Sequence, residues 1–366
     1  MVNLSSHSTR FFFGWQHGVN ALMRLGLDAV SDSFGQGASA QKLLRAGALA
    51  LFTGAGLIVN HAFSLTAHDE GHMEAATAIG ASYVALVRVD NGQEMSIGEF
   101  FLEAFNFTSE PGLYLYFKDN LTSKEAAYVA GEGLNVNQLI ADAVGSDIDD
   151  GAGHITDLAP YLLNKLWGIT YFLETGPYTD AGTYVSLLND QGFAGVTRNA
   201  VIFLTAVSCA SSGSFLALMK GTYDFLADGT SRVEPLGLKI GDVTVFWPEL
   251  TTWLNPDNVS LSASVDAAVS DFLLLRAGVD LPVLGNTSAN PELTFGTTVK
   301  MAALSLGAEL TSNFAGWPFL TGGVELPLGN AFSVGIEGFI GGRTTMRELR
   351  EYPLGPGISG FLRARL

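Results

Sequence analysis

Basic residues are scarce in this chain. Only 19 of its 366 residues are Lys or Arg, against 36 Asp or Glu, which gives a formal net charge of -17. Nucleic-acid binding depends on attraction between basic side chains and phosphates, so this charge excludes a nucleic acid as partner. It also excludes attachment to anionic lipid through a basic surface, because the sequence contains no Lys/Arg cluster. Any attachment to a membrane therefore has to be apolar.

Cysteine and targeting signals are scarce as well. The single cysteine, Cys209, leaves no partner for an intrachain disulfide. The N-terminus lacks the ordered basic, apolar and small-residue regions of a secretory signal. Residues 1–26 instead favour an amphipathic helix, which either lies at a membrane interface or docks on the protein's own core.

Charged residues are few relative to apolar ones. They make up 15% of the chain, hydrophobic residues make up 48%, and the mean hydropathy is +0.28. Such a chain carries more apolar side chains than a soluble surface of this size normally accommodates. The 43 glycines and 24 phenylalanines suit thin-walled β structure or closely packed membrane helices. The composition therefore predicts a membrane protein, and the length suits two domains.

Residues 1–231 are predicted to form a mainly helical, membrane-associated domain. Residues 40–80 contain no proline and are rich in Ala and Leu, which predicts one long helix or a helix pair. This segment and a second apolar run, residues 199–219, each have roughly the length that a bilayer span needs. Membrane spans and buried helices are both compatible with these runs. Shorter helices are expected at residues 100–107, 125–144 and 161–174.

Residues 232–366 are predicted to form an antiparallel all-β domain, because short apolar runs alternate there with Gly, Pro and Asn. In AFSVGIEGFIGG, alternate positions from Phe332 onwards are mostly apolar, whereas Glu337 falls on the other face. Outer-membrane barrels have this alternation, and about seven or eight strands would fit, enough for a small closed barrel. A soluble β-sandwich gives the same alternation. The predicted class is thus α+β, with a barrel or a sandwich after the helices.

The run HDEGH, from His68 to His72, lies within the long predicted helix. Residues four apart share one face of a helix, so the two imidazoles can bind one zinc ion. Asp69 stands where the H-E-x-x-H motif carries the glutamate that activates the metal-bound water. The run resembles the metal-binding helix of zinc metallopeptidases, particularly the membrane-embedded ones, in which the motif follows an apolar helix. It departs from that motif at Asp69, which is one methylene shorter than Glu.

A third protein ligand is needed to complete such a zinc site. Glu132 is the favoured candidate, because it lies in a Gly-flanked turn that opens an apolar helix; the rivals are Asp142, Glu99 and Glu103. His61 shares a helical stripe with the two histidines. It lies about 10 Å from His68 along the helix axis, too far to bind the same ion, and is instead a candidate for proton transfer.

Two functions are compatible with these features. The resemblance implies a membrane-associated metallopeptidase, in which His68 and His72 bind zinc and Asp69 polarises the water that attacks a peptide bond; a carboxylate such as Glu132 would complete the zinc ligands. The alternative is a non-catalytic outer-membrane barrel or structural envelope protein with a helical plug, in which the histidines are a structural pair. Both place the protein in a membrane of the bacterial cell envelope with lipid as a partner, and neither determines the oligomeric state.

Overall fold

Helices occupy the first part of the chain and antiparallel strands the last part, which confirms the predicted α+β class. The computed structural model describes residues 8–33, 39–106, 112–173, 179–301, 304–314, 318–328, 332–341 and 357–364. The helices are α1 (Ser8–Asp32), α2 (Ser39–Ala78), α3 (Ile97–Glu103), α4 (Ser123–Asp149), α5 (Leu158–Leu173), α6 (Asp180–Asp190), α7 (Arg198–Ser211) and α8 (Gly213–Asp228), with a 3-10 turn, η2, at Ile155–Asp157.

A long, continuous helix, α2, forms the segment that was expected to be one helix or a pair. It is long and apolar enough to cross a membrane, and 28% of its most apolar stretch is buried in the protein. The second apolar run is broken: α7 and α8 meet at Ser212 and are bent by 53°. Small residues allow α2 to pack closely on α4, because a Cβ on Gly71 would lie 2.6 Å from a methyl group of Val136. The two helices therefore meet almost backbone to backbone at the histidine run.

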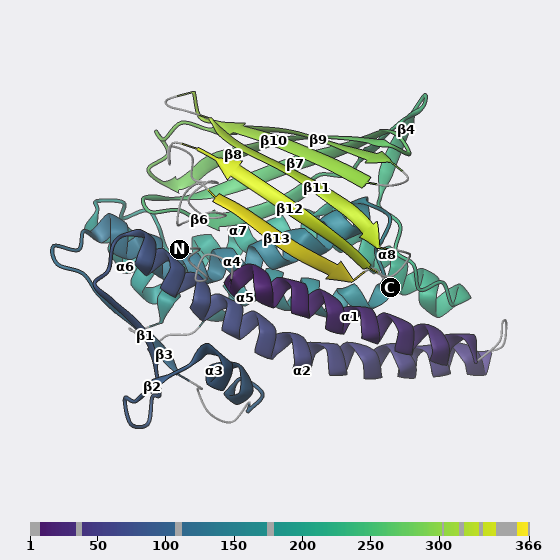
Figure 1. Ribbon diagram of the computed structural model, residues 1–366, viewed down its shortest axis with the longest axis horizontal. Helices are drawn as coiled ribbons and strands as arrows, with labels where there is room; N and C mark the ends of the chain where they lie inside the picture. Colours follow the sequence, from purple (N-terminus) through teal and green to yellow (C-terminus); the bar gives the residue numbers. More distant parts are fainter. Residues whose placement is uncertain are drawn as a thin grey trace.

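Three short strands, which the sequence did not predict, lie between α2 and α4. They are β1 (Tyr83–Val87), β2 (Glu94–Met95) and β3 (Leu113–Phe117), and they pair in the order β2-β1-β3. Tyr114 and Tyr116 on β3 contact the core formed by α2 and α4. This small sheet stands at one end of the helical layer (Figure 1).

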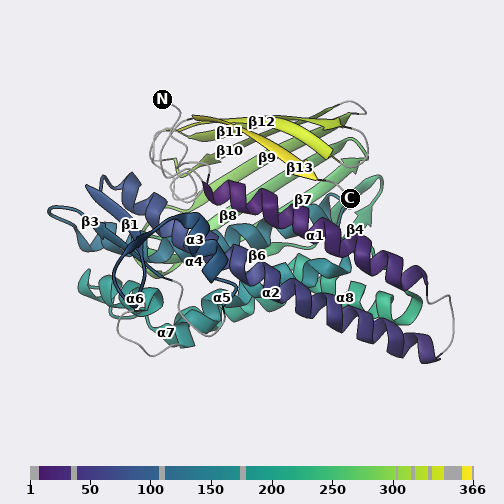
Figure 2. The same cartoon turned by 60° about the horizontal axis from the view of Figure 1, so that its bottom comes forward.

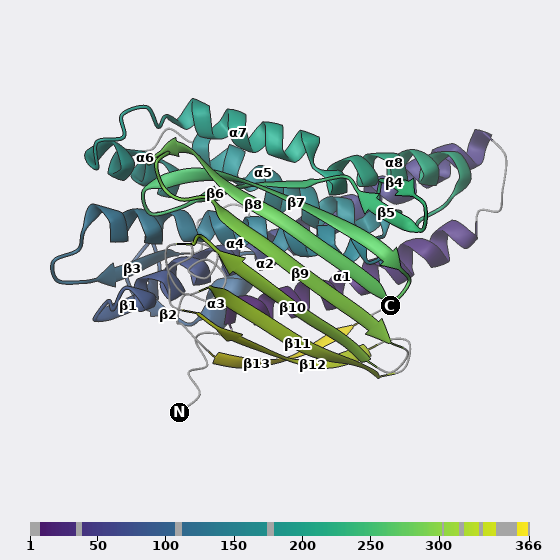
Figure 3. The same ribbon diagram turned by 90° about the horizontal axis from the view of Figure 1, so that it is seen from above.

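The large sheet is antiparallel, and neighbouring strands in space are mostly neighbours in sequence. Its strands are β4 (Gly237–Ile240), β5 (Val243–Phe246), β6 (Glu249–Leu254), β7 (Asn258–Ser270), β8 (Leu273–Gly285), β9 (Glu292–Met301), β10 (Leu304–Ser312), β11 (Phe319–Leu328), β12 (Phe332–Ile340) and β13 (Gly357–Ala364). The order runs from β13 through to β7 and then β5 and β4, and β6 pairs with β7. The sheet arches over the helices (Figures 1 and 3).

The sheet is not closed across the described residues, so the small closed barrel that was one expectation does not form there. Helices stand where the outer strands would have to meet. At one side α1 packs along β13, and at the other β6 packs on α4 and α7 (Figure 2). The helices and strands also share a core across the expected division at residue 231: Leu254 and Val259 pack with Tyr184 and Leu188. The change from helix to strand itself falls where expected, between α8 and β4.

Candidate metal centre

The two histidines of the HDEGH run face each other on α2. The Nε2 atoms of His68 and His72 are 3.1 Å apart, and both side chains are buried. Each ring is held at its other nitrogen. His68 Nδ1 lies 2.8 Å from Asn137 Oδ1, and His72 Nδ1 lies 2.6 Å from the carbonyl oxygen of Val129. Both partners come from α4, which thereby sets the orientation of both imidazoles.

A chain of hydrogen bonds fixes which nitrogen of His68 carries the proton. Asn164 Nδ2 donates to the carbonyl of Pro160, which can only accept, so Asn164 Oδ1 accepts from Asn137 Nδ2 at 2.9 Å. Asn137 Oδ1 is then the acceptor that faces His68, and His68 Nδ1 must donate. The carbonyl of Val129 requires the same of His72 Nδ1. In the neutral rings both Nε2 atoms therefore present lone pairs toward each other.

Asp180, the first residue of α6, supplies a third ligand atom. Its Oδ2 lies 3.3 Å from His68 Nε2 and 3.2 Å from His72 Nε2. Thr179 caps the helix by accepting a hydrogen bond from the backbone N–H of Gly182, which fixes where α6 begins. These three residues are the group in the described part of the chain whose side chains could jointly hold a metal ion.

The spacing of the three atoms matches a tetrahedral ion. Zinc binds His nitrogen and carboxylate oxygen at about 2.0–2.2 Å, which in a tetrahedron keeps the ligand atoms about 3.3 Å from each other. The three observed separations are 3.1, 3.2 and 3.3 Å. Three acceptors that converge without a donor between them repel one another, and a cation at their centre removes that repulsion. Both the donor set and its geometry therefore fit zinc.

Tyr114 of β3 orients the carboxylate. Its hydroxyl donates to Asp180 Oδ1 at 2.9 Å, which leaves Oδ2 facing the imidazoles, and its ring stacks on His72 with centroids 4.1 Å apart. Burial raises the pKa of Tyr114, and the neighbouring charge of Asp180 raises it further, so the phenol keeps its proton. Burial alone would raise the pKa of Asp180, but the charge of a protonated His72 and hydrogen bonds from protonated imidazoles outweigh it and hold that pKa well below its usual value.

Gly133 of α4 leaves the space that the two imidazoles occupy. A Cβ at this position would lie 2.8 Å from His68 Nε2 and still closer to His72 Nε2. Val129, Gly133 and Asn137 follow one another at intervals of four residues, so they form one stripe on α4 that faces the histidine helix. Both the hydrogen-bond partners and the space for the ligand atoms come from this stripe.

The other predicted site residues lie in different surroundings. Asp69 is buried beside His68, and burial raises the pKa of its carboxyl to about 7. Glu132 is not a member of the cluster. It is buried on α4, about 100° around the helix from Gly133, and accepts a hydrogen bond from Asn135. The structure thus brings Asp180 to the histidines, where the sequence favoured Glu132.

The three rivals of Glu132 are bound elsewhere. Asp142 is paired with Lys165, Glu103 forms an ion pair with Arg88, and Glu99 completes the capping box of α3. His61 stacks on Trp167, with ring centroids 5.3 Å apart, and His68 stacks on the same ring at 6.3 Å. Trp167 therefore contacts two of the three histidines of the predicted stripe, and a role for His61 in proton transfer stays a prediction.

Asp180 was not among the site residues predicted from the sequence. The Thr-Asp pair at residues 179–180 is a recognisable helix start, but nothing in the spacing connects it with the histidines. Comparison with family models, with curated proteins and with solved structures gives no match to this chain. What the site can do therefore rests on its own geometry.

Replacing Tyr114 by Phe tests how the carboxylate is held. We expect zinc affinity to fall about 10–100-fold, the usual effect of removing a group that orients a ligand, while the fold is unchanged. The measurement is a competition titration against a zinc chelator. Tyr116→Phe, two residues along the same face of β3, is the matched control and should bind zinc as the wild type does. Equal affinities in the two variants would contradict the role of Tyr114.

Proposed function

We propose that the protein is a zinc-dependent metallopeptidase whose metal is held by His68, His72 and Asp180. The observation that carries this proposal is the convergence of three acceptor atoms, 3.1–3.3 Å apart, with both Nδ1 atoms already bonded to acceptors. Two histidines and one carboxylate are the protein ligands of several zinc peptidases. The peptide bond as substrate is the part of the proposal that comes from the resemblance of HDEGH to H-E-x-x-H.

Different side chains are assigned to binding the metal, orienting its ligands and accepting a proton. Zinc bound here would act as a Lewis acid and lower the pKa of a water molecule. His68, His72 and Asp180 would hold the zinc ion, while Asn137, Val129 and Tyr114 fix the orientation of these three side chains. Asp69 stands next to His68 in a site that is nearly closed to solvent, where its carboxylate can accept a proton.

Metal content is the direct test. The wild type purified without chelators should contain one zinc per chain, and His68→Ala and Asp180→Ala should contain almost none by elemental analysis. Glu132→Gln is the control and should retain the metal. An imidazolium proton could also satisfy the three acceptors. Equally little zinc in all four proteins would therefore reject the metal centre, and selective loss in Glu132→Gln would move the third ligand to Glu132.

Asp69→Asn separates binding from turnover. The amide has the shape of the carboxylate but cannot take up a proton at neutral pH. We expect zinc content to be unchanged and cleavage of a fluorogenic peptide library to fall by about 10²–10⁴-fold, the usual contribution of a general base. Unchanged cleavage would contradict the role of Asp69. Full zinc occupancy with no cleavage by the wild type would favour the non-catalytic alternative.

A further inference from the structure

The charged residues of strands β7–β12 all lie on one face of the large sheet. Paired residues in antiparallel strands share a face, and alternate residues of one strand return to it. Asp266 pairs with Arg276, Arg276 with Gly296, and Gly296 with Glu309, which defines one row across four strands. The pairing continues the row to Thr321 on β11 and Phe339 on β12. The remaining charged residues lie two or four residues along their strands from a member of this row, and therefore on the same face: Asp280, Glu292, Lys300, Glu325 and Glu337.

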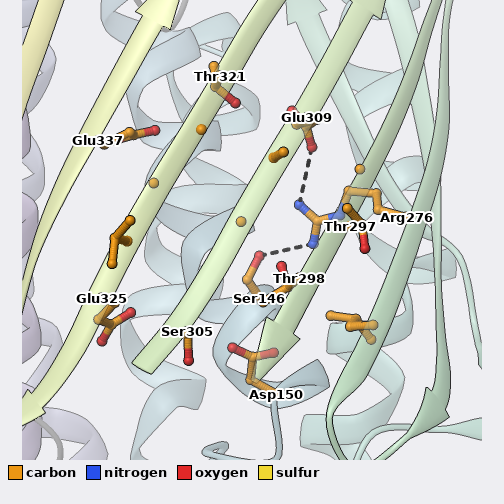
Figure 4. Close-up of a pocket in the computed structure, with 17 residues that line it drawn as sticks. Ser146, Asp150, Arg276, Thr297, Thr298, Ser305, Glu309, Thr321, Glu325 and Glu337 are labelled. Carbon is orange, nitrogen blue, oxygen red and sulfur yellow. Dashed lines mark hydrogen bonds and ion pairs between the residues drawn. The ribbon is translucent and has the colours of Figure 1, made fainter. Parts of the chain in front are cut away.

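This charged face is the concave one, turned toward the helices. Arg276 bonds to Asp266 at 2.7 and 2.8 Å and reaches Ser146 of α4, and Lys300 bonds to Asp150 at the end of that helix. Figure 4 shows the charged side chains of neighbouring strands pointing into one cavity, with Ser146 and Asp150 below them. The ionisable groups of the sheet are thus enclosed between the strands and α4.

The opposite, convex face of β8–β12 carries no charge. Its paired positions hold large apolar side chains that are 39–62% exposed: Leu275, Leu281, Phe295, Met301, Leu306, Leu310, Leu320, Val324, Leu326, Val334, Ile336 and Ile340. Soluble proteins rarely expose a continuous apolar surface across several strands. A sheet with charges inside and apolar side chains outside has the polarity of a lipid-exposed sheet.

The strands also have the length for a bilayer. A tilted strand needs about 9–11 residues to cross the hydrocarbon layer. β9, β10, β11 and β12 have 10, 9, 10 and 9 residues, and β8 has 13. An open sheet edge in lipid leaves backbone groups without partners. Here α1 of the same chain packs along β13 at one edge, and α4 and α7 pack on β6, which pairs with β7 toward the other edge, where β4 is the outermost strand.

We infer that the convex face of β8–β12 contacts the acyl chains of a lipid bilayer. The helices of the chain cover the opposite, charged face of the open sheet. A second copy of the chain fits this face poorly, because two convex surfaces touch only along a line, whereas acyl chains follow the curvature. The inference concerns a different surface from the metal centre and does not depend on it.

Nitroxide labels on neighbouring residues of the full chain test this surface. In a Cys209→Ser background, Leu306→Cys and Ile336→Cys carry the label on the convex face, and Ser305→Cys carries it on the concave face of the same strand as Leu306. The proteins are placed in vesicles of phosphatidylcholine and phosphatidylglycerol. Electron paramagnetic resonance then measures collisions with oxygen, which enters lipid, and with a water-soluble nickel chelate.

We expect the labels at positions 306 and 336 to lose collisions with the nickel chelate and to gain collisions with oxygen, relative to the label at 305. Nickel collisions at 306 and 336 as frequent as those at 305, or a protein that stays dispersed without detergent and does not float with the vesicles, would overturn the inference. Dipolar broadening at 306 with exclusion of both reagents would show that a second copy covers the face, and would overturn it as well.

Discussion

Gly133→Ala is expected to abolish zinc binding while the protein still folds. The added methyl group would lie 2.8 Å from His68 Nε2 and closer still to His72 Nε2. It would therefore occupy the space between the ligand atoms and the metal, and the imidazoles could avoid it only by giving up their bonds to α4. Overpacking of this kind costs about 1–3 kcal/mol, and the higher helix propensity of Ala returns about 1 kcal/mol. Elemental analysis and a chelator titration measure the loss.

Gly54→Ala is the matched control for Gly133→Ala. Gly54 also lies inside a helix, α2, but a Cβ there meets nothing within 4 Å. This variant should bind zinc as the wild type does and should be more stable by up to about 1 kcal/mol. Zinc bound normally by Gly133→Ala would mean that the imidazoles do not face α4 in the way described. Loss of zinc in both variants would point to a general effect of helix substitution and would contradict the steric argument.

The histidine pair could be predicted from sequence because its geometry is local. A spacing of four residues on a helix fixes the relation of His68 to His72 wherever the helix packs. The ligand that completes the cluster is not local. Asp180 reaches the histidines only because α4, α5 and α6 fold back over α2. The spacing of residues in the sequence does not predict how these helices pack. Glu132 was favoured because a Gly-flanked turn was expected to open a helix there, but it lies well inside α4, and the cluster is completed by Asp180.

The role of α4 was likewise only partly visible. A helix was expected at residues 125–144, but the interval of four that links Val129, Gly133 and Asn137 shows a common face only once the partner helix is known. Asn137 acts as an acceptor because Asn164 and Pro160 fix its orientation. These hydrogen bonds link α2, α4 and α5, and they determine the tautomer of His68 on which the metal site depends.

The β segment shows the same division between local and non-local information. The alternation from Phe332 onwards predicted two unlike faces, and the pairing register confirms them. Closure of the sheet was not predictable in this way, since it depends on whether helices stand beside the outer strands. The small sheet β1–β3 was missed because its strands have only 5, 2 and 5 residues, too few for a clear period. Packing on α2 and α4 stabilises it.

Lys165→Met is expected to destabilise the protein by about 3–5 kcal/mol, the usual cost of removing one partner from a buried ion pair. Lys165 is fully buried, and its ammonium group lies 3.0 Å from Asp142 and 3.4 Å from Glu249. It also donates to Thr251 and to the carbonyl of Leu250. Burial lowers the pKa of Lys165, but the two carboxylates raise it by more, so the group stays charged. The substitution would leave both carboxylates without their cation.

These contacts join α4, α5 and β6, so the loss should appear as a weaker attachment of the helices to the sheet. Urea titration in detergent, followed by circular dichroism, measures the free energy of unfolding. Lys220→Met is the matched control: Lys220 is half-exposed, bonds to Asp224 one turn away on α8, and should contribute less than about 0.5 kcal/mol. Adding Asp142→Asn to Lys165→Met removes one of the two carboxylate charges that have lost their cation, so the double variant should recover part of the lost free energy of unfolding. Equal destabilisation by the two lysine substitutions, or no recovery in the double variant, would show that this ion pair does not hold the helices to the sheet.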